Sequence, residues 1–221
     1  MVTVAGMHSH AVFHGLRGWP GWVYRASKMM IVMTNTKGGV GKSTLAAHLA
    51  IWLFDQGRKV ALLDTDEQAT ASGWIERAEK GITVAKATTV DAIRREMKKL
   101  RSTHEFIVAD SPGSGGEAAQ AITLLADIAL IPLQPSKPDL RAVKDALKFV
   151  RLAQEMTGGT RPKATIVLTF TAKGDVQTRR LRHDLSEIGV PIAKSEIRRL
   201  NAFRDACDSS VTRMPEREAG E

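Results

Sequence analysis

Two lysines, Lys37 and Lys42, frame a glycine-rich run at residues 36–44 whose residue types could bind a phosphate group. The run follows a short apolar stretch and opens an amphipathic one, which is the strand–loop–helix setting of a P-loop. Glycines let consecutive backbone N–H groups turn towards one phosphate, and the positive end of the following helix points at the same anion. The run therefore predicts a site for a nucleoside triphosphate.

The loop residues have distinct expected roles. Lys42 would reach the β- and γ-phosphates of ATP, and Ser43 would place its hydroxyl on Mg²⁺. Thr36 stands where the usual pattern has glycine, so the flexibility comes from inside the loop. Lys37 is either a solvated lysine or a charge aimed at a phosphate on a second subunit, as an arginine finger acts in trans. The predicted cofactor-binding residues are Lys37, Gly38, Gly39, Val40, Gly41, Lys42, Ser43 and Thr44.

Acidic residues follow two further apolar stretches, with Asp64 and Asp66 after one and Asp110 after the other. The carboxyl ends of parallel strands meet at one edge of a sheet, so these acids should lie beside the loop. Asp110 would hold Mg²⁺ together with Ser43. The acids at 64 and 66 can hold the metal through water or orient an attacking water. The flexible residues 111–116 would lie near the γ-phosphate and act as a switch.

Apolar and amphipathic stretches alternate from residue 29 onward. Strands are expected at 31–33, 60–63, 82–84, 106–109, 128–131 and 164–170, and helices at 43–56, 69–80, 90–100, 117–126, 138–156 and 175–188. Pro132 is expected to end its strand, with a last short strand at Ile192 and a last helix at 201–207. Continuously apolar strands separated by helices indicate an α/β P-loop NTPase with a mostly parallel twisted sheet covered by helices on both faces.

The composition of the 221-residue chain fits one ordinary globular domain. Residues 1–28 are expected to be a poorly ordered extension, with a start site assigned too far upstream as a second interpretation. The ATPase domain is expected at 29–211 and a charged flexible tail at 212–221. Cys207 is the single cysteine, which rules out an internal disulfide and favours a cytoplasmic protein. No apolar stretch approaches the roughly 20 residues of a membrane span.

These motifs together resemble the ParA/MinD family of deviant Walker A ATPases. The resemblance covers nearly everything after Met29, and the spacing and short length are most similar to small plasmid-partition members such as ParF. In the family's usual Asp-x-Asp-Pro-Gln tract, Glu67 here replaces the proline. The residues that carry the resemblance are 37–44, 63–68, 107–113 and 130–136.

The resemblance implies a cycle of ATP binding and hydrolysis with Lys37, Lys42 and Asp66 as the catalytic residues. ATP would drive formation of a homodimer in which Lys37 reaches the phosphates bound by the partner subunit. Asp66 would help to position the hydrolytic water. The ATP-bound dimer would bind DNA without sequence preference, and a ParB-like centromere-binding or adaptor protein would stimulate hydrolysis. Such a cycle segregates or positions plasmid or chromosome DNA on the nucleoid.

The formal net charge of +8 favours a polyanionic partner such as DNA, with a solvated basic surface as the alternative. Half of this charge lies between residues 173 and 204, where eight basic residues outnumber four acids. The predicted contacts to backbone phosphates are Arg179, Arg180, Arg198 and Arg199.

Other proteins of this fold remain as alternatives. The same ATPase cycle could position a protein cargo such as an organelle, a chemoreceptor cluster or a transfer complex. A MinD-like membrane ATPase would need an amphipathic C-terminal helix, and residues 211–218 have no apolar face. A nitrogenase-type reductase needs cysteine ligands, and one cysteine fits poorly. No Cys/His constellation supports the glutamine chemistry of an amidotransferase.

Overall fold

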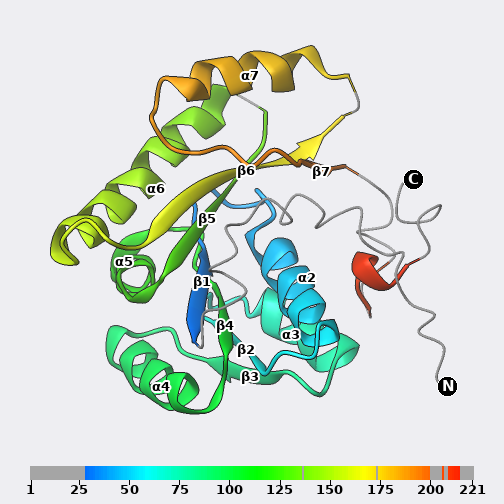
Figure 1. The fold of residues 1–221 in the computed structure, drawn as a ribbon, viewed down its shortest axis with the longest axis vertical. Helices are drawn as coiled ribbons and strands as arrows, with labels where there is room; N and C mark the ends of the chain where they lie inside the picture. Colours follow the sequence, from blue (N-terminus) through cyan, green and yellow to red (C-terminus); the bar gives the residue numbers. More distant parts are fainter. Residues whose placement is uncertain (1–27, 136, 173, 200–205, 207–208, 215–221) are drawn as a thin grey trace, which may run out of the picture.

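The computed structural model describes residues 28–135, 137–172, 174–199, 206 and 209–214. In these residues seven strands form one parallel sheet in the order β3-β2-β4-β1-β5-β6-β7 (Figure 1). The strands are β1 Met29–Met33, β2 Val60–Asp64, β3 Thr83–Lys86, β4 Phe106–Asp110, β5 Ile128–Leu133, β6 Lys163–Thr171 and β7 Ile197–Arg198. The α-helices are α2 Lys42–Asp55, α3 Thr70–Ala78, α4 Val90–Thr103, α5 Gly116–Leu125, α6 Lys137–Met156 and α7 Val176–Ser186, followed by the 3-10 helix η2 Val211–Arg213. The predicted α/β fold is confirmed.

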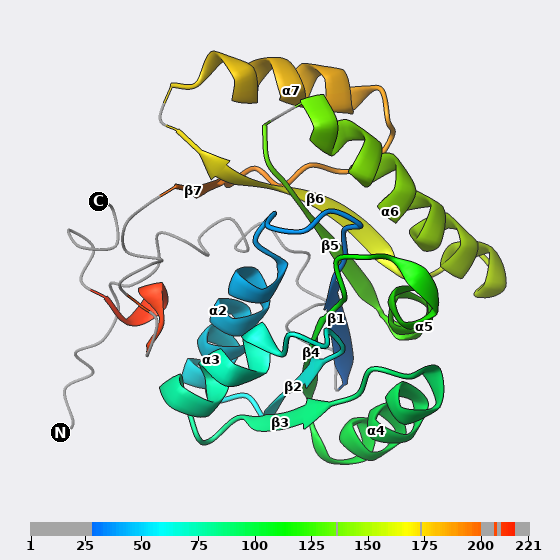
Figure 2. The same cartoon turned by 180° about the vertical axis from the view of Figure 1, so that it is seen from behind.

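Helices cover both faces of the sheet, as Figures 1 and 2 show from opposite sides. Alternate residues of β1 divide between the two cores, because successive side chains of a strand point to opposite faces. Met30 and Val32 pack with α4, α5, α6 and α7, whereas Ile31 and Met33 pack with α2 and α3. Both sets are buried, which explains why the strand is apolar throughout.

The prediction that Pro132 ends its strand is wrong, since β5 continues to Leu133. Beyond Leu130, β5 pairs only with β6. The carbonyl of Pro132 accepts a hydrogen bond from the Asn35 side chain at 2.7 Å, on the side away from β6. The missing N–H of the proline would point to that same side, so no bond of the β5–β6 ladder is lost.

The C-terminal part differs from the prediction in extent. Ile192 forms a single bridge with Ile166 rather than a strand. Arg213, which lies in the predicted tail at 212–221, makes ion pairs with Asp55 and Glu79 at 2.6 and 2.7 Å. The predicted helix at 201–207, apart from Ala206, and the N-terminal extension up to residue 27 lie outside the described residues.

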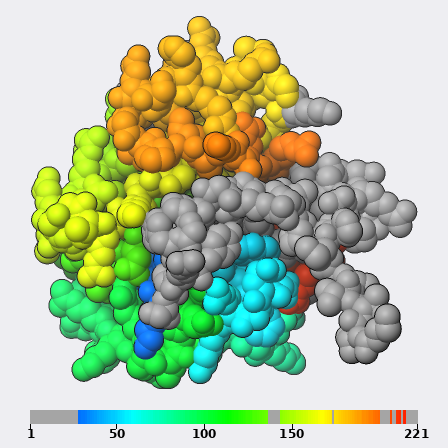
Figure 3. All heavy atoms as spheres, in the orientation of Figure 1, coloured from blue at the N-terminus to red at the C-terminus, as the bar shows by residue number. Residues whose placement is uncertain are grey.

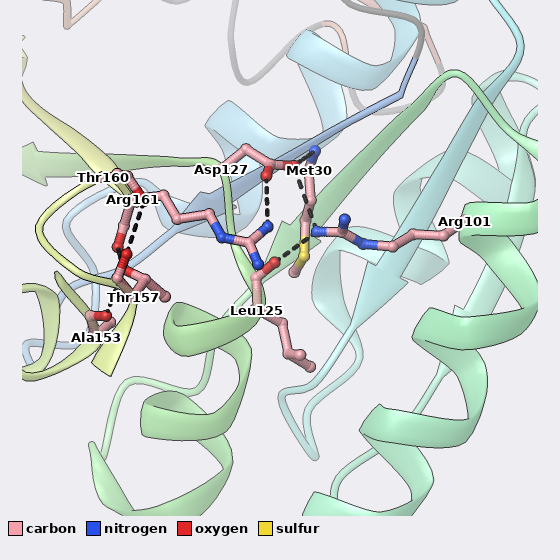
Figure 4. A network of polar contacts seen from close by, with 8 residues as sticks. All are labelled: Met30, Arg101, Leu125, Asp127, Ala153, Thr157, Thr160 and Arg161. Atoms are coloured by element: carbon pink, nitrogen blue, oxygen red, sulfur yellow. Dashed lines mark hydrogen bonds and ion pairs between the residues drawn. The ribbon is translucent and has the colours of Figure 1, made fainter. Parts of the chain in front are cut away.

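A polar network joins several elements at the amino-terminal edge of the sheet (Figure 4). The carboxylate of Asp127 accepts hydrogen bonds from the Met30 N–H at 2.8 Å and from Arg161 at 3.2 Å. Arg101, near the end of α4, donates to the Leu125 carbonyl at 2.7 Å. The network fixes the starts of β1 and β5 and leaves the opposite edge for the site.

Candidate nucleotide-binding site

The predicted phosphate loop lies at the centre of the carboxyl edge of the sheet. It follows β1, which β4 and β5 flank, and it opens α2. A cavity of about 840 Å³ lies at this edge. It is lined by the loop, by Thr65 and Asp66 after β2, by residues 112–115 after β4, and by Phe170 of β6. The structure therefore brings together the phosphate loop, the acids that follow β2 and the segment that follows Asp110 at the end of β4, as predicted from the sequence.

The loop is held in shape by side chains that sequence reasoning did not single out. Asn35 is buried, and its Oδ1 accepts a hydrogen bond from the Lys37 N–H at 3.0 Å. Gln134 Nε2 donates to the Gly39 carbonyl at 2.6 Å, and Thr169 Oγ1 donates to the Val40 carbonyl at 2.9 Å. These contacts turn loop carbonyls away from the cavity towards β5 and β6. Gln134 could have been singled out from the sequence because it lies in the segment 130–136, which carries the family resemblance but was assigned no role.

Glycine is required at the end of the loop. Gly41 has a φ of 92°, in the region that residues with a Cβ rarely adopt. A Cβ there would also come within 3.3 Å of the Phe170 ring. Gly39 has a φ of 73°. Since α2 begins at Lys42, directly after Gly41, its first N–H groups face the end of the cavity where a phosphate would bind.

Lys42 is only 6% exposed, and its Nζ donates to the Lys37 carbonyl at 3.0 Å. Burial lowers the pKa of this lysine, while the charges of Asp110 and Asp66 act in the opposite direction. A buried ammonium is costly unless an anion accompanies it. A phosphate in the adjacent cavity would supply that anion, which agrees with the predicted role of Lys42.

Asp110 is fully buried, and neither of its carboxylate oxygens has a hydrogen-bond partner of good geometry among the described residues. Burial raises the pKa of Asp110 to about 7, and the nearby Ser43 hydroxyl opposes this shift. Ionisation of such a buried carboxyl is costly unless a cation accompanies it. Mg²⁺ is commonly held by one or two carboxylates, a hydroxyl and phosphate oxygens. Asp110 and Ser43 fit that set of ligands.

Asp64 and Asp66 have different environments at the end of β2. The Asp64 carboxylate is buried and accepts hydrogen bonds from the N–H groups of Asp66 and Ser72, at 3.1 and 2.8 Å. It thus fixes the turn into α3, and a bond to a metal through water stays a prediction. Asp66 is half-buried and lines the cavity, in a position where it can contact a water molecule.

The predicted switch at 111–116 packs against the phosphate loop. A Cβ on Gly113 would lie 3.2 Å from Lys42 Nζ and 3.5 Å from the Gly38 Cα. Ser111 is buried, and its hydroxyl has no partner among the described residues. Because residues 111–116 contact the phosphate loop, a phosphate bound by the phosphate loop would also affect the conformation of residues 111–116. Lys37 is half-exposed, and its trans role is not tested within one subunit.

The four predicted DNA-binding arginines are all exposed and belong to one lobe, formed by β6, α7 and β7. Arg179 and Arg180 lie on α7, whose side chains stand at the surface in gold and orange at the top of Figure 3. Arg198 ends β7, and Arg199 follows it. Arg182 is not available to DNA in the same way, because it bonds to Glu196 at 2.9 Å.

The fold and the site define a P-loop nucleotide-binding protein. The chain belongs to the family described as the CobQ/CobB/MinD/ParA nucleotide binding domain, which matches residues 31–212. The expected membership of the ParA/MinD group is thereby confirmed.

Two curated relatives illustrate the range of the family. The chain is 29% identical over 189 residues to the "Maintenance of carboxysome distribution protein A" of Halothiobacillus neapolitanus, covering 82% of this chain and 85% of that protein. It is 27% identical over 167 residues to the sporulation initiation inhibitor protein Soj of Bacillus subtilis, covering 57% of this chain and 66% of Soj.

Solved structures agree with the fold. Apo McdA from Cyanothece superposes with a TM-score of 0.71 at 15% identity, covering 84% of this chain and 92% of the other. Cobyrinic acid a,c-diamide synthase from Mycobacterium smegmatis, solved with an ATP analog and magnesium, gives a TM-score of 0.65 at 21% identity, covering 82% and 93%. No helix among the described residues is long and apolar enough to cross a membrane.

Proposed function

We propose that this protein is a Mg²⁺-dependent ATPase that dimerises on ATP and binds DNA without sequence preference. A partner protein of the ParB-like or adaptor kind stimulates hydrolysis, and the cycle segregates or positions plasmid or chromosome DNA on the nucleoid. The observation that carries the proposal is a pair of buried, interacting charged groups, Lys42 in the cavity lining and Asp110 at the end of β4. A match of 48% identity over 59 residues, 26% of this chain, to the chromosome-partitioning ATPase Soj of Thermus thermophilus supports the DNA-related part.

The residues would act together as follows. The loop N–H groups and Lys42 bind the phosphates, and Asp110 with Ser43 holds Mg²⁺. Mg²⁺ held by these two residues would supply positive charge against the phosphates during transfer. Asp66 orients the attacking water, and Lys37 supplies a positive charge to the nucleotide of the partner subunit. The arginines of the β6–α7–β7 lobe contact backbone phosphates of DNA.

The test combines three measurements on the purified protein. ATP with Mg²⁺ should convert a monomer into a dimer in size-exclusion chromatography, and ADP should not. The dimer should retain random-sequence DNA at low salt and should hydrolyse ATP slowly. Absence of ATP binding in a calorimetric titration would overturn the proposal at its base, whereas a dimer that ignores DNA would remove only the DNA step.

A second candidate keeps the ATPase cycle and replaces the DNA cargo with a protein assembly. It is favoured by the similarity to the carboxysome distribution protein, which spans most of both chains. Deletion of the gene separates the two candidates. Loss of a plasmid or missegregation of a chromosome supports a DNA cargo, whereas misplaced protein foci with normal DNA inheritance support a protein cargo.

A further inference from the structure

The cavity has one end that the phosphate chemistry does not use. The strands β2 and β4, which carry the acids, lie on one side of β1, whereas β6 lies on the other side beyond β5. Asp66 and Phe170 both line the cavity and come from these opposite sides of the sheet. The phosphate loop lies between them, because it follows β1.

A nucleoside triphosphate is polar at one end and aromatic at the other. If the terminal phosphate faces the acids and Lys42, the nucleoside must extend towards β6. Among the described residues that line the cavity, Phe170 is the only aromatic side chain. A base that stacks on an aromatic ring gains affinity without needing a particular hydrogen-bond pattern. The Phe170 ring is therefore placed to receive the base.

The backbone at Phe170 is held in an uncommon conformation. Its φ is 54°, in the left-handed region that bulky residues seldom adopt. The preceding residue, Thr169, bonds to the Val40 carbonyl, and the ring lies against Gly41. The phosphate loop and the ring are thus fixed relative to each other, as a site that binds both ends of one ligand requires.

A second side chain supports the ring. The Arg199 guanidinium lies over the Phe170 ring, 5.8 Å from its centroid. The Arg199 N–H donates to the Thr171 carbonyl at 3.0 Å, which anchors the arginine beside the strand that carries the ring. A cation over an aromatic face is attracted to it, so Arg199 restricts the orientations of the ring.

We propose that Phe170 binds the base of the nucleotide by stacking, and that Arg199 is a positioning residue that holds the ring. This inference rests on the proposed function, since it takes the ligand to be a nucleoside triphosphate. It adds a contact for the nucleoside end of the ligand.

The test compares ATP with inorganic tripolyphosphate, which has the phosphates but no base. Both are titrated with Mg²⁺ into the wild-type protein and the Phe170→Ala variant by calorimetry. Affinity for ATP should fall about 5- to 150-fold in the variant, as expected when one stacking interaction is removed, while affinity for tripolyphosphate stays unchanged. Phe170→Tyr should retain ATP affinity. An equal loss for both ligands would mean that the ring only supports the loop, and no loss for ATP would equally overturn the inference.

Further variants control for the backbone and for the arginine. Phe170→Asn removes the ring but suits the left-handed conformation, so it should lose ATP affinity as Phe170→Ala does. Arg199→Ala should weaken ATP binding, and Lys194→Ala, which removes another exposed basic side chain between α7 and β7, should not. A wild-type protein that binds neither ligand would refute the proposed function. A wild-type protein that binds both, with variants that behave identically, would refute this inference alone.

Discussion

At the residue scale, the candidate site combines two buried groups of opposite charge type, Lys42 of the phosphate loop and Asp110 at the end of β4. Burial lowers the pKa of Lys42 and raises that of Asp110 to about 7, so the folded protein disfavours the charge on each. Burial of these two charges costs free energy when no ligand is bound. A phosphate beside the lysine and a cation beside the carboxylate would offset that cost. Binding of a magnesium nucleotide would satisfy both at once.

Replacement of Lys42 tests this arrangement directly. Lys42→Ala should show no measurable ATP binding where the wild type is saturated, because the variant cannot make a charge-assisted hydrogen bond to the phosphates in a buried site. Calorimetric titration measures the affinity. Lys99→Ala, which removes an exposed lysine of α4, serves as the control and should bind normally. Retained ATP affinity in Lys42→Ala would rule out the phosphate-loop assignment.

Lys37 should behave differently from Lys42. Lys37→Ala should bind ATP nearly as well as the wild type, because Lys42 and the loop N–H groups remain. Its stimulated turnover should nevertheless be lost, since the charge that it supplies acts on the partner subunit's nucleotide. Turnover measured with DNA and the partner protein present checks this. Undiminished stimulated turnover would argue that Lys37 is a solvated lysine.

At the element scale, the C-terminal segment 209–214 closes over α2 and α3. His48 of α2 is fully buried, its Nδ1 lies 2.8 Å from Ser210 Oγ, and its ring meets that of Trp74 edge to face at 4.9 Å. Trp74 Nε1 donates to the Ser209 carbonyl at 2.9 Å. Arg213 adds ion pairs from the same segment. Since α2 begins at the phosphate loop, the segment stabilises the helix that supports the site.

This packing predicts a pH dependence of stability. Burial lowers the pKa of His48 to about 3, well below its ordinary value of 6.5. Between these pH values the unfolded chain binds a proton that the folded chain does not, so stability falls as the pH drops below 6.5. The loss should reach about 2 kcal/mol at pH 5. Urea unfolding of the wild type and of His48→Gln at pH 7 and pH 5 measures it. An equal loss in the variant would exclude His48 as the source.

The sequence predicted element types better than element ends. The strand β4 and its alternation with helices followed from the local pattern of apolar residues, because a strand buried on both faces must be apolar. The continuation of β5 through Pro132 depended on which side of the strand lacked a neighbour, and no local pattern contains that information. The packing of Arg213 likewise depended on Asp55 and Glu79, far away in the chain.

The same limit applied to the site. The positions of Lys42, Ser43 and Asp110 at one edge of the sheet were predictable, because these residues follow the ends of apolar strands in the sequence. The position of Phe170 in the cavity lining was not predictable, since it depends on the contact between β6 and the end of the phosphate loop. The contacts of a side chain across the sheet follow from strand order, which the sequence pattern left open.

At the scale of the whole molecule, the net charge of +8 is spread over more than one surface. Helix α4 presents the exposed pair Arg94 and Arg95, whereas the β6–α7–β7 lobe presents Arg198 and Arg199. If overall positive charge alone attracts DNA, removal of either arginine pair should lower the DNA affinity equally. If the lobe is the DNA-binding surface, removal of Arg198 and Arg199 should lower the DNA affinity more.

The double variant Arg198→Ala/Arg199→Ala should therefore weaken retention of random-sequence DNA, and Arg94→Ala/Arg95→Ala, with the same change in charge, should not. Binding is measured by fluorescence anisotropy at saturating ATP, so that any effect of Arg199 on nucleotide affinity is removed. In the lobe variant, the slope of log affinity against log salt should become shallower by about 1 for each DNA phosphate that is no longer bound. An equal decrease for both double variants would mean that DNA responds to overall charge, and the lobe would lose its assignment as the DNA-binding surface.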